Sequence, residues 1–105
     1  MSEGISLSIE SFYEEEGVIF YVISLSFEQT MWKVRRRFKQ LASLHDTLNS
    51  KIAQLPTLPS KTLWRKKDPA WIESRKGILE DYCRELVVRT DTLNSEEVRF
   101  IFEID

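Results

Sequence analysis

The spacing of apolar residues changes once along this 105-residue chain, at Phe38, and this change limits the fold more than any other feature. Before it, Ile5, Leu7 and Ile9 alternate with polar residues, which is the period of a half-buried strand. Residues 18–27 are rich in β-branched and aromatic types, and residues 31–37 alternate apolar with basic side chains. The sequence therefore predicts three strands at 5–10, 18–27 and 31–37.

The segments between these strands favour turns. Glu14-Glu15-Glu16-Gly17 is polar and ends in glycine, which is typical of a hairpin loop. Glu28-Gln29-Thr30 is a second short polar segment. Loops this short join neighbouring antiparallel strands, so we expect a three-stranded meander.

After residue 37 the period becomes three to four, which predicts an amphipathic helix built on Phe38, Leu41, Leu44, Leu48 and Ile52. We expect Pro56 and Pro59 to stop this helix and hold an extended loop. Asp68-Pro69 is a favourable helix start, since aspartate caps and proline suits the first helical position.

The second helix is predicted to run from there through Val87. Asn94 and Glu97 fit a variant of the capping box for a last helix. The predicted fold class is α+β, a three-stranded antiparallel β-meander followed by a helical subdomain with a Pro-rich loop, forming a single domain over residues 1–105.

The net charge of −2 conceals a strongly basic middle. Residues 1–30 carry −6, residues 31–76 carry +9 and residues 77–105 carry −5. Such asymmetry indicates an anionic partner, either a nucleic acid or an anionic membrane surface, with a solvated basic surface as the simpler explanation. The aromatic residues are expected in loops and core rather than on a stacking sheet, so no nucleic acid partner is expected.

Several function classes lack their sequence signals. No apolar run approaches the roughly 18 residues of a membrane span, and the acidic N-terminal segment does not fit a signal peptide. Cys83 has no partner for an internal disulfide and is expected to be a buried thiol in a reducing, cytoplasmic setting. His45 has no second ligand at metal spacing. We therefore predict a binding module, not an enzyme, without cofactor or metal.

Arg35-Arg36-Arg37-Phe38 stands where the strand pattern gives way to the helix pattern. Guanidinium groups match phosphate oxygens two at a time, and an aromatic face beside them suits a ring-shaped ligand. On a strand Arg36 points away from Arg35 and Arg37, so we expect Arg36 to be structural and Arg37 to contact phosphate. For Phe38, ring stacking and core packing are equally good interpretations.

These features together resemble the phox-homology (PX) domain family. The family's Arg-aromatic pattern is matched by Arg36-Arg37-Phe38-Lys39-Gln40-Leu41, its Pro-rich loop by Leu55-Pro56-Thr57-Leu58-Pro59-Ser60-Lys61, and its helix arginine by Arg75. The likeness covers residues 5–104. Phe38 stands in place of the commoner tyrosine and Leu41 in place of the usual phenylalanine, and the proline loop is leaner than in the family.

The resemblance implies binding of phosphoinositides, most often phosphatidylinositol 3-phosphate, by a peripheral protein of endosomal membranes. Carried over, Arg37 would grip the 3-phosphate and Phe38 would lie against the inositol ring. Lys61 would reach the 1-phosphate, and Arg75 would bind the 4- and 5-hydroxyls.

A second cluster, Leu63-Trp64-Arg65-Lys66-Lys67, places a tryptophan beside three bases. This composition suits a membrane interface, where the indole enters the headgroup region and the cations meet anionic lipid. A tryptophan folded onto the core is the alternative. Pro56 and Pro59 also form a PxxP string, but a rigid loop that places Lys61 is the better interpretation.

The hypothesis from the sequence is thus a phosphoinositide-binding, membrane-targeting module. Its alternative is a protein-protein interaction module on the same fold without specific lipid binding. The first predicts selective binding of one lipid through Arg37, and the second predicts partner binding that survives loss of Arg37.

Overall fold

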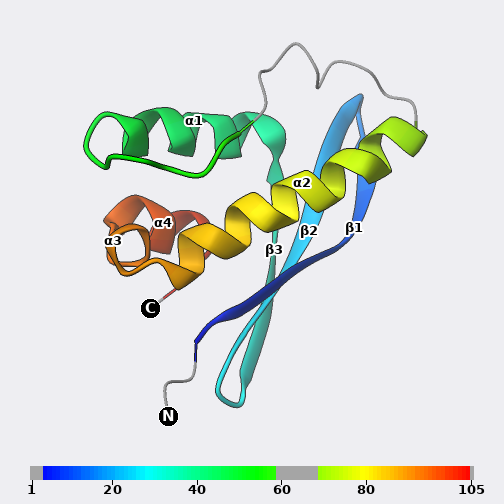
Figure 1. Ribbon diagram of the computed structural model, residues 1–105. Coiled ribbons are helices and arrows are strands. Elements are labelled where there is room, and N and C mark those ends of the chain that lie inside the picture. The colour runs from blue at the N-terminus through cyan, green and yellow to red at the C-terminus, as the bar shows by residue number, and fades with distance from the viewer. Residues whose placement is uncertain (1–3, 59–68, 105) are drawn as a thin grey trace.

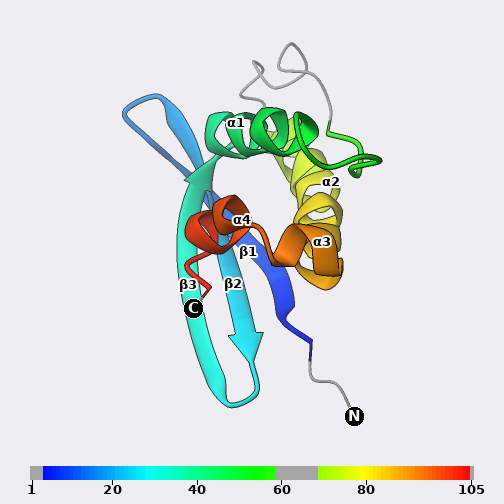
Figure 2. The same ribbon diagram turned by 90° about the vertical axis from the view of Figure 1, so that its left-hand side faces the viewer.

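The computed structural model describes residues 4–58 and 69–104. Three long strands come first: β1 (Ser6–Glu15), β2 (Val18–Phe27) and β3 (Thr30–Arg37). They pair antiparallel in the order β1-β2-β3, which confirms the predicted meander. The α+β class is confirmed as well, because helices follow the sheet and lie on one of its faces (Figures 1 and 2).

The first hairpin turn is tighter than predicted. β1 continues to Glu15, so only Glu16 and Gly17 form the turn, and both have positive φ angles, 52° and 79°. Two consecutive left-handed residues make the type I′ geometry whose twist matches that of paired strands. Glycine adopts this angle without steric cost, which explains its place at the second position.

A β-bulge interrupts the pairing of β1 with β2 at Glu10, between Ile9 and Ser11. Before the bulge Leu7 and Ile9 face the helices and are buried. At this point two side chains of α2 make hydrogen bonds to the free edge of β1. Glu80 Oε1 accepts from the backbone N–H of Ile9 at 2.7 Å. Arg84 Nε donates to the carbonyl oxygen of Leu7 at 2.8 Å.

Within residues 4–58 and 69–104 four helices follow, α1 (Phe38–Asn49), α2 (Pro69–Val88), α3 (Thr90–Leu93) and α4 (Glu96–Ile101). The prediction that the prolines end the first helix is wrong. α1 ends at Asn49, before Pro56, and Ser50 Oγ donates to the carbonyl oxygen of Thr47 at 2.7 Å beyond that end. Ile52 therefore packs against the core from a turn rather than from the helix.

The predicted cap of the last helix is displaced by one residue. Ser95, not Asn94, is the N-cap, and its Oγ accepts from the backbone N–H of Val98 at 3.2 Å. The hydroxyl at Ser95 reaches the third helical residue as a serine cap normally does. Pro69 opens α2 as predicted, while its expected cap, Asp68, lies outside the described residues.

One apolar core joins the inner face of the sheet to α1, α2 and α4. Burying a large aliphatic side chain contributes about 1.5–3 kcal/mol, so these contacts dominate the favourable free energy of folding. Cys83 belongs to this core, as predicted. The buried members of this core cluster are Leu7, Ile9, Tyr21, Ile23, Leu25, Val34, Leu41, Leu44, Leu48, Ile72, Leu79, Tyr82, Cys83, Leu86, Val87, Val98 and Phe102.

Candidate functional site

The candidate site lies where β3 runs directly into α1, with no loop between strand and helix (Figure 1). Arg37 is the last residue of β3 and also precedes the helix, with an extended backbone at φ −90° and ψ 158°. Its backbone N–H donates to Oε1 of Gln40 at 2.8 Å. This bond satisfies a donor at the corner and sets the direction in which α1 leaves the sheet.

Arg35 projects from the face of the sheet opposite the helices. Its Cζ lies 5.0 Å from the centre of the Phe20 ring, and Nη1 donates to the hydroxyl of Tyr13 at 2.6 Å. That hydrogen bond is the main cause of the raised pKa of Arg35. Arg35 is thus engaged by neighbours on its own sheet.

Arg36 projects toward the helices, as its place on the strand predicts. Nε donates to the carbonyl oxygen of Ile101 at 2.9 Å, and Nη2 lies 3.2 Å from Oε2 of Glu103. The side chain is only 17% exposed. The prediction that Arg36 is structural is therefore confirmed, because it ties β3 to the end of α4.

Arg37 differs from both neighbours. Its side chain is half-buried, and its Nε is buried without a hydrogen-bond partner in the described part of the chain. A buried donor left unsatisfied costs about 1–3 kcal/mol, so an acceptor that reached it would be favoured. Phe38 is also half-buried and packs against the core, which supports one of its two expected roles; ring stacking stays a prediction.

Arg75 enters the site from α2 and is only 4% exposed. Its Cζ lies 4.5 Å from the centre of the Trp71 ring, one helical turn earlier. Arg75 also interacts electrostatically with Tyr21, which pairs with Arg36 across the β2–β3 ladder. The guanidinium of Arg75 is therefore held over the end of the sheet from which Arg37 projects.

Burial shifts the pKa values of both Arg75 and Tyr21. Desolvation lowers the pKa of Arg75, and the nearby Tyr21 partly opposes that shift. Desolvation raises the pKa of Tyr21 to about 12, and the positive charge of Arg75 partly opposes it. At neutral pH the tyrosine stays neutral and the arginine stays charged, so the site presents a cation.

The sequence interpretation missed Trp71 and Tyr21 as parts of this site. Trp71 is the aromatic partner of Arg75. Its spacing of four residues from Arg75 places both on one helix face, and that was the signal for the contact. No sequence signal distinguished Tyr21 from other aromatic residues in β2.

Six predicted residues fall in the segment that joins α1 to α2 and lie outside the described residues. They are Lys61, expected at the 1-phosphate, and the expected membrane interface of Leu63, Trp64, Arg65, Lys66 and Lys67. Their roles stay predictions. Leu55 and Leu58, at the start of the same segment, pack against the core.

The described residues, 4–58 and 69–104, show no group of three or more side chains suited to hold a metal ion. Within the same ranges, no helix has both the length and the apolar character needed to cross a bilayer. The arrangement offers fixed cations and an aromatic ring for binding an anion.

Comparison with known proteins gives the family. A family model described as the PX domain matches residues 24–105. Kinesin-like protein KIF16B of Mus musculus is 34% identical over 67 residues, which make up 62% of this chain and 5% of that protein. The chain thus spans a small part of this curated relative.

Solved structures share the fold at lower sequence identity. A designed CISK-PX domain gives a TM-score of 0.79 at 24% identity, with 93% of this chain and 98% of that chain covered. The mouse SNX19 PX domain with a bound sulphate ion gives 0.74 at 22% identity, covering 99% and 100%. With the family model matching residues 24–105, the chain belongs to the PX domain family.

Proposed function

We propose that residues 1–105 act as one phosphoinositide-binding domain that targets membranes and selects phosphatidylinositol 3-phosphate. PX domains are non-catalytic modules that generally bind phosphoinositides, and the proposal adds the lipid and the residues. The observation that carries it is the buried Nε of Arg37, which has no hydrogen-bond partner in the described part of the chain. A phosphate oxygen there would complete the site.

The proposed division of labour follows from position. Arg37 at the corner binds the 3-phosphate and Phe38 lies against the ring. Arg75 binds the 4- and 5-hydroxyls, and its 4% exposure restricts the space for further phosphates there. Lys61 binds the 1-phosphate.

Residence on the membrane is proposed to come from the second cluster. Trp64 would enter the headgroup region beside Leu63, and Arg65, Lys66 and Lys67 would meet anionic lipid. Each base near such a surface adds about 1 kcal/mol. Two weak signals together anchor a protein more stably than either alone, and the expected location is the cytoplasmic face of endosomes.

Liposome co-sedimentation tests the lipid. Vesicles carrying each singly, doubly or triply phosphorylated phosphoinositide are compared at physiological salt with phosphatidylserine vesicles of equal charge. Selective pelleting with phosphatidylinositol 3-phosphate is the expected result. Pelleting that follows total charge would reduce the site to a basic surface, and no pelleting would favour a protein-interaction module.

A further inference from the structure

Trp71 is the third residue of α2 and its side chain is half-buried. It does not belong to the apolar core formed by the described residues, whereas its neighbour Ile72 is buried within that core. One helical turn after Trp71, the Cζ of Arg75 lies over the indole, 4.5 Å from the ring centre. The place of this large aromatic side chain is therefore better explained by its contact with Arg75 than by core packing.

The guanidinium of Arg75 has lost much of its contact with water. The residue is only 4% exposed, and its Nε and Nη2 atoms are buried. Burial lowers the pKa of Arg75, because the charged form is the one that loses hydration. An aromatic face attracts a cation, and the attraction is stronger where water is excluded. Trp71 therefore offsets part of the cost of burying this charge.

An aromatic partner stabilises the guanidinium in a way that suits binding of neutral hydroxyls. The attraction comes from the electrons of the ring and involves no oxygen acceptor. A carboxylate at the position of Trp71 would instead occupy N–H groups of Arg75 in charge-assisted hydrogen bonds. With the indole there, the charge is stabilised and its N–H groups are not taken up by that partner.

The position of the Arg75 guanidinium is set before a ligand arrives. An arginine side chain has many rotamers, and a ring on the same helix face, four residues earlier, restricts them. From the sheet side, Tyr21 of β2 is near enough to interact electrostatically with the same group. A donor that is already ordered loses less entropy on binding, so the contact with Trp71 favours the ligand that fits this one position.

We propose that Trp71 is a positioning residue that makes the site select an inositol ring with free 4- and 5-hydroxyls. The inference rests on the proposed function, in which Arg75 binds these two hydroxyls. Held by Trp71, the guanidinium occupies the space that an added phosphate would need. Released from Trp71, it can turn and pair with such a phosphate, because charge-assisted hydrogen bonds are stronger than bonds to neutral hydroxyls.

Calorimetric titration with soluble headgroups tests the proposal, since these probes exclude any effect of Trp71 on membrane insertion. The probes are inositol 1,3-bisphosphate and the inositol 1,3,4- and 1,3,5-trisphosphates. Trp71→Ala should weaken binding of the bisphosphate about tenfold and lower its preference over each trisphosphate by a similar factor. Trp71→Leu, which keeps an apolar side chain without an aromatic face, should do the same. Trp71→Phe should keep most of the preference.

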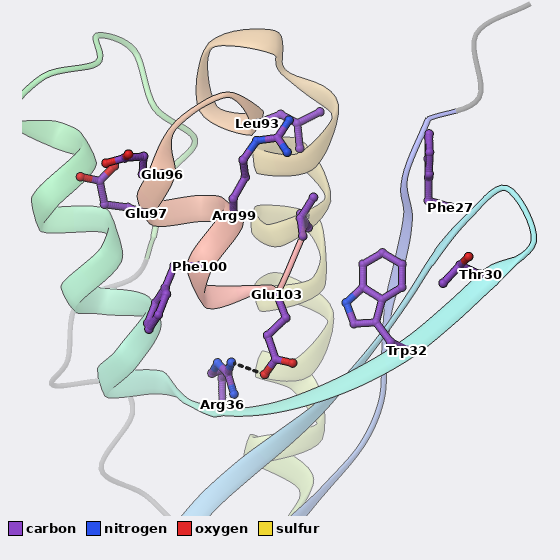
Figure 3. Close-up of a pocket in the computed structure, with 11 residues that line it drawn as sticks. Phe27, Thr30, Trp32, Arg36, Leu93, Glu96, Glu97, Arg99, Phe100 and Glu103 are labelled. Atoms are coloured by element: carbon purple, nitrogen blue, oxygen red, sulfur yellow. Dashed lines mark hydrogen bonds and ion pairs between the residues drawn. The ribbon is translucent and has the colours of Figure 1, made fainter.

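Phe100→Ala is the matched control, because it also removes an aromatic ring from a helix surface. Phe100 is 84% exposed and lines a groove between β3 and α4 (Figure 3). None of the described residues that line this groove belongs to α2. Phe100→Ala should therefore change neither the affinity for the bisphosphate nor the preference.

A double-mutant cycle shows whether Trp71 acts through Arg75. In an Arg75→Ala background, Trp71→Ala should cause no further loss of affinity for the bisphosphate, because the group that it positions is already absent. A role of Trp71 in general stability would instead add its effect in both backgrounds.

The contact itself is tested without ligand by nuclear magnetic resonance. The Nε–H resonance of Arg75, assigned with Arg75→Lys, should carry a ring-current shift that Trp71→Ala removes and Trp71→Phe partly keeps. An unchanged resonance in Trp71→Ala overturns the inference whatever the lipid results are.

The inference is also overturned if a selective wild type keeps its preference in Trp71→Ala, if Phe100→Ala has the same effect, or if the loss persists in the Arg75→Ala background. Weaker binding of phosphatidylinositol 3-phosphate vesicles by Trp71→Ala, with unchanged affinity for the soluble bisphosphate, would make Trp71 a membrane contact instead. A wild type with no preference for the bisphosphate overturns the proposed function and this inference together, which separates that failure from the others.

Discussion

Alanine substitutions of the two adjacent arginines at the end of β3 should have different effects. Arg36→Ala should lower stability, whereas Arg37→Ala should weaken lipid binding. Arg36→Ala removes the hydrogen bond from Nε to the carbonyl oxygen of Ile101 at 2.9 Å, made by a side chain that is only 17% exposed. A hydrogen bond from a charged group contributes about 1.5–3 kcal/mol. The ion pair with Glu103 adds little, since that carboxylate is 62% exposed. We expect Arg36→Ala to lower the free energy of unfolding by about 2 kcal/mol, or Tm by about 10 °C.

Arg37→Ala should leave Tm nearly unchanged, since the buried Nε of Arg37 makes no hydrogen bond to the described residues. Its effect should appear in lipid binding. A bidentate contact to a phosphate holds two charge-assisted hydrogen bonds, and losing about 3 kcal/mol weakens binding roughly a hundredfold. Arg36→Ala should keep its affinity when it is measured well below its own Tm.

The assay pairs thermal unfolding, followed by circular dichroism, with calorimetric titration of a soluble inositol 1,3-bisphosphate headgroup at 15 °C. Wild type and the two variants are compared in one buffer. Equal losses of affinity in both variants would refute the assignment of Arg37 to the ligand and Arg36 to the fold. A large drop of Tm in Arg37→Ala would refute the inference that Arg37 contributes little to stability because its Nε makes no hydrogen bond to the described residues.

Three further outcomes follow from local contacts. Ser95→Ala removes the cap on the Val98 N–H and should cost about 1 kcal/mol in urea unfolding, whereas no change would remove the capping argument. Burial raises the pKa of the Cys83 thiol, so a disulfide reagent at pH 8 should modify it only at the rate of unfolding; reaction at the rate of a free thiol contradicts this. The hydrogen bond from Arg89 holds the pKa of Asp91 below its usual range, so its stabilising contribution is present above about pH 4 and lost as pH falls further. Asp91→Asn should therefore show a shallower loss of stability than wild type between about pH 5 and pH 2, and equal slopes would contradict it.

The sheet was predictable from the sequence because its apolar period is local. Trp32 and Val34 lie on the helix side while Lys33 and Arg35 lie on the other, as the alternation predicts. The structural role of Arg36 followed from the same alternation. These assignments need only the geometry of one strand.

Helix ends were less predictable, because several short-range signals compete there. Pro56 is a strong helix breaker, yet α1 ends earlier, at Asn49, where hydrogen bonds to the carbonyl oxygens of Thr47 and Leu48 replace the helical pattern. At the last helix, Asn94 and Ser95 are both good caps. Only the folded backbone shows which of them meets the free N–H of Val98.

The site was predictable in part. Arg37 and Phe38 are neighbours in sequence, so their joint place at the corner required only the change of period. Arg75 is 38 residues from Arg37, and its burial beside Tyr21 depends on how α2 crosses the sheet. The spacing of apolar residues along the sequence does not indicate how α2 crosses the sheet, so it could not predict the position of Arg75.

The bonds from α2 to the bulged strand have a consequence for the behaviour of the domain at high concentration. An unprotected strand edge is a template for pairing with another chain, and proteins that leave one open tend to aggregate. Here the Glu80 carboxylate and the Arg84 guanidinium occupy the backbone groups of Ile9 and Leu7 that such a chain would use. These two side chains of α2 thus make the hydrogen bonds that a neighbouring strand would otherwise make. We expect the loss of these two side chains to increase aggregation through the edge of β1 more than it lowers the stability of the fold.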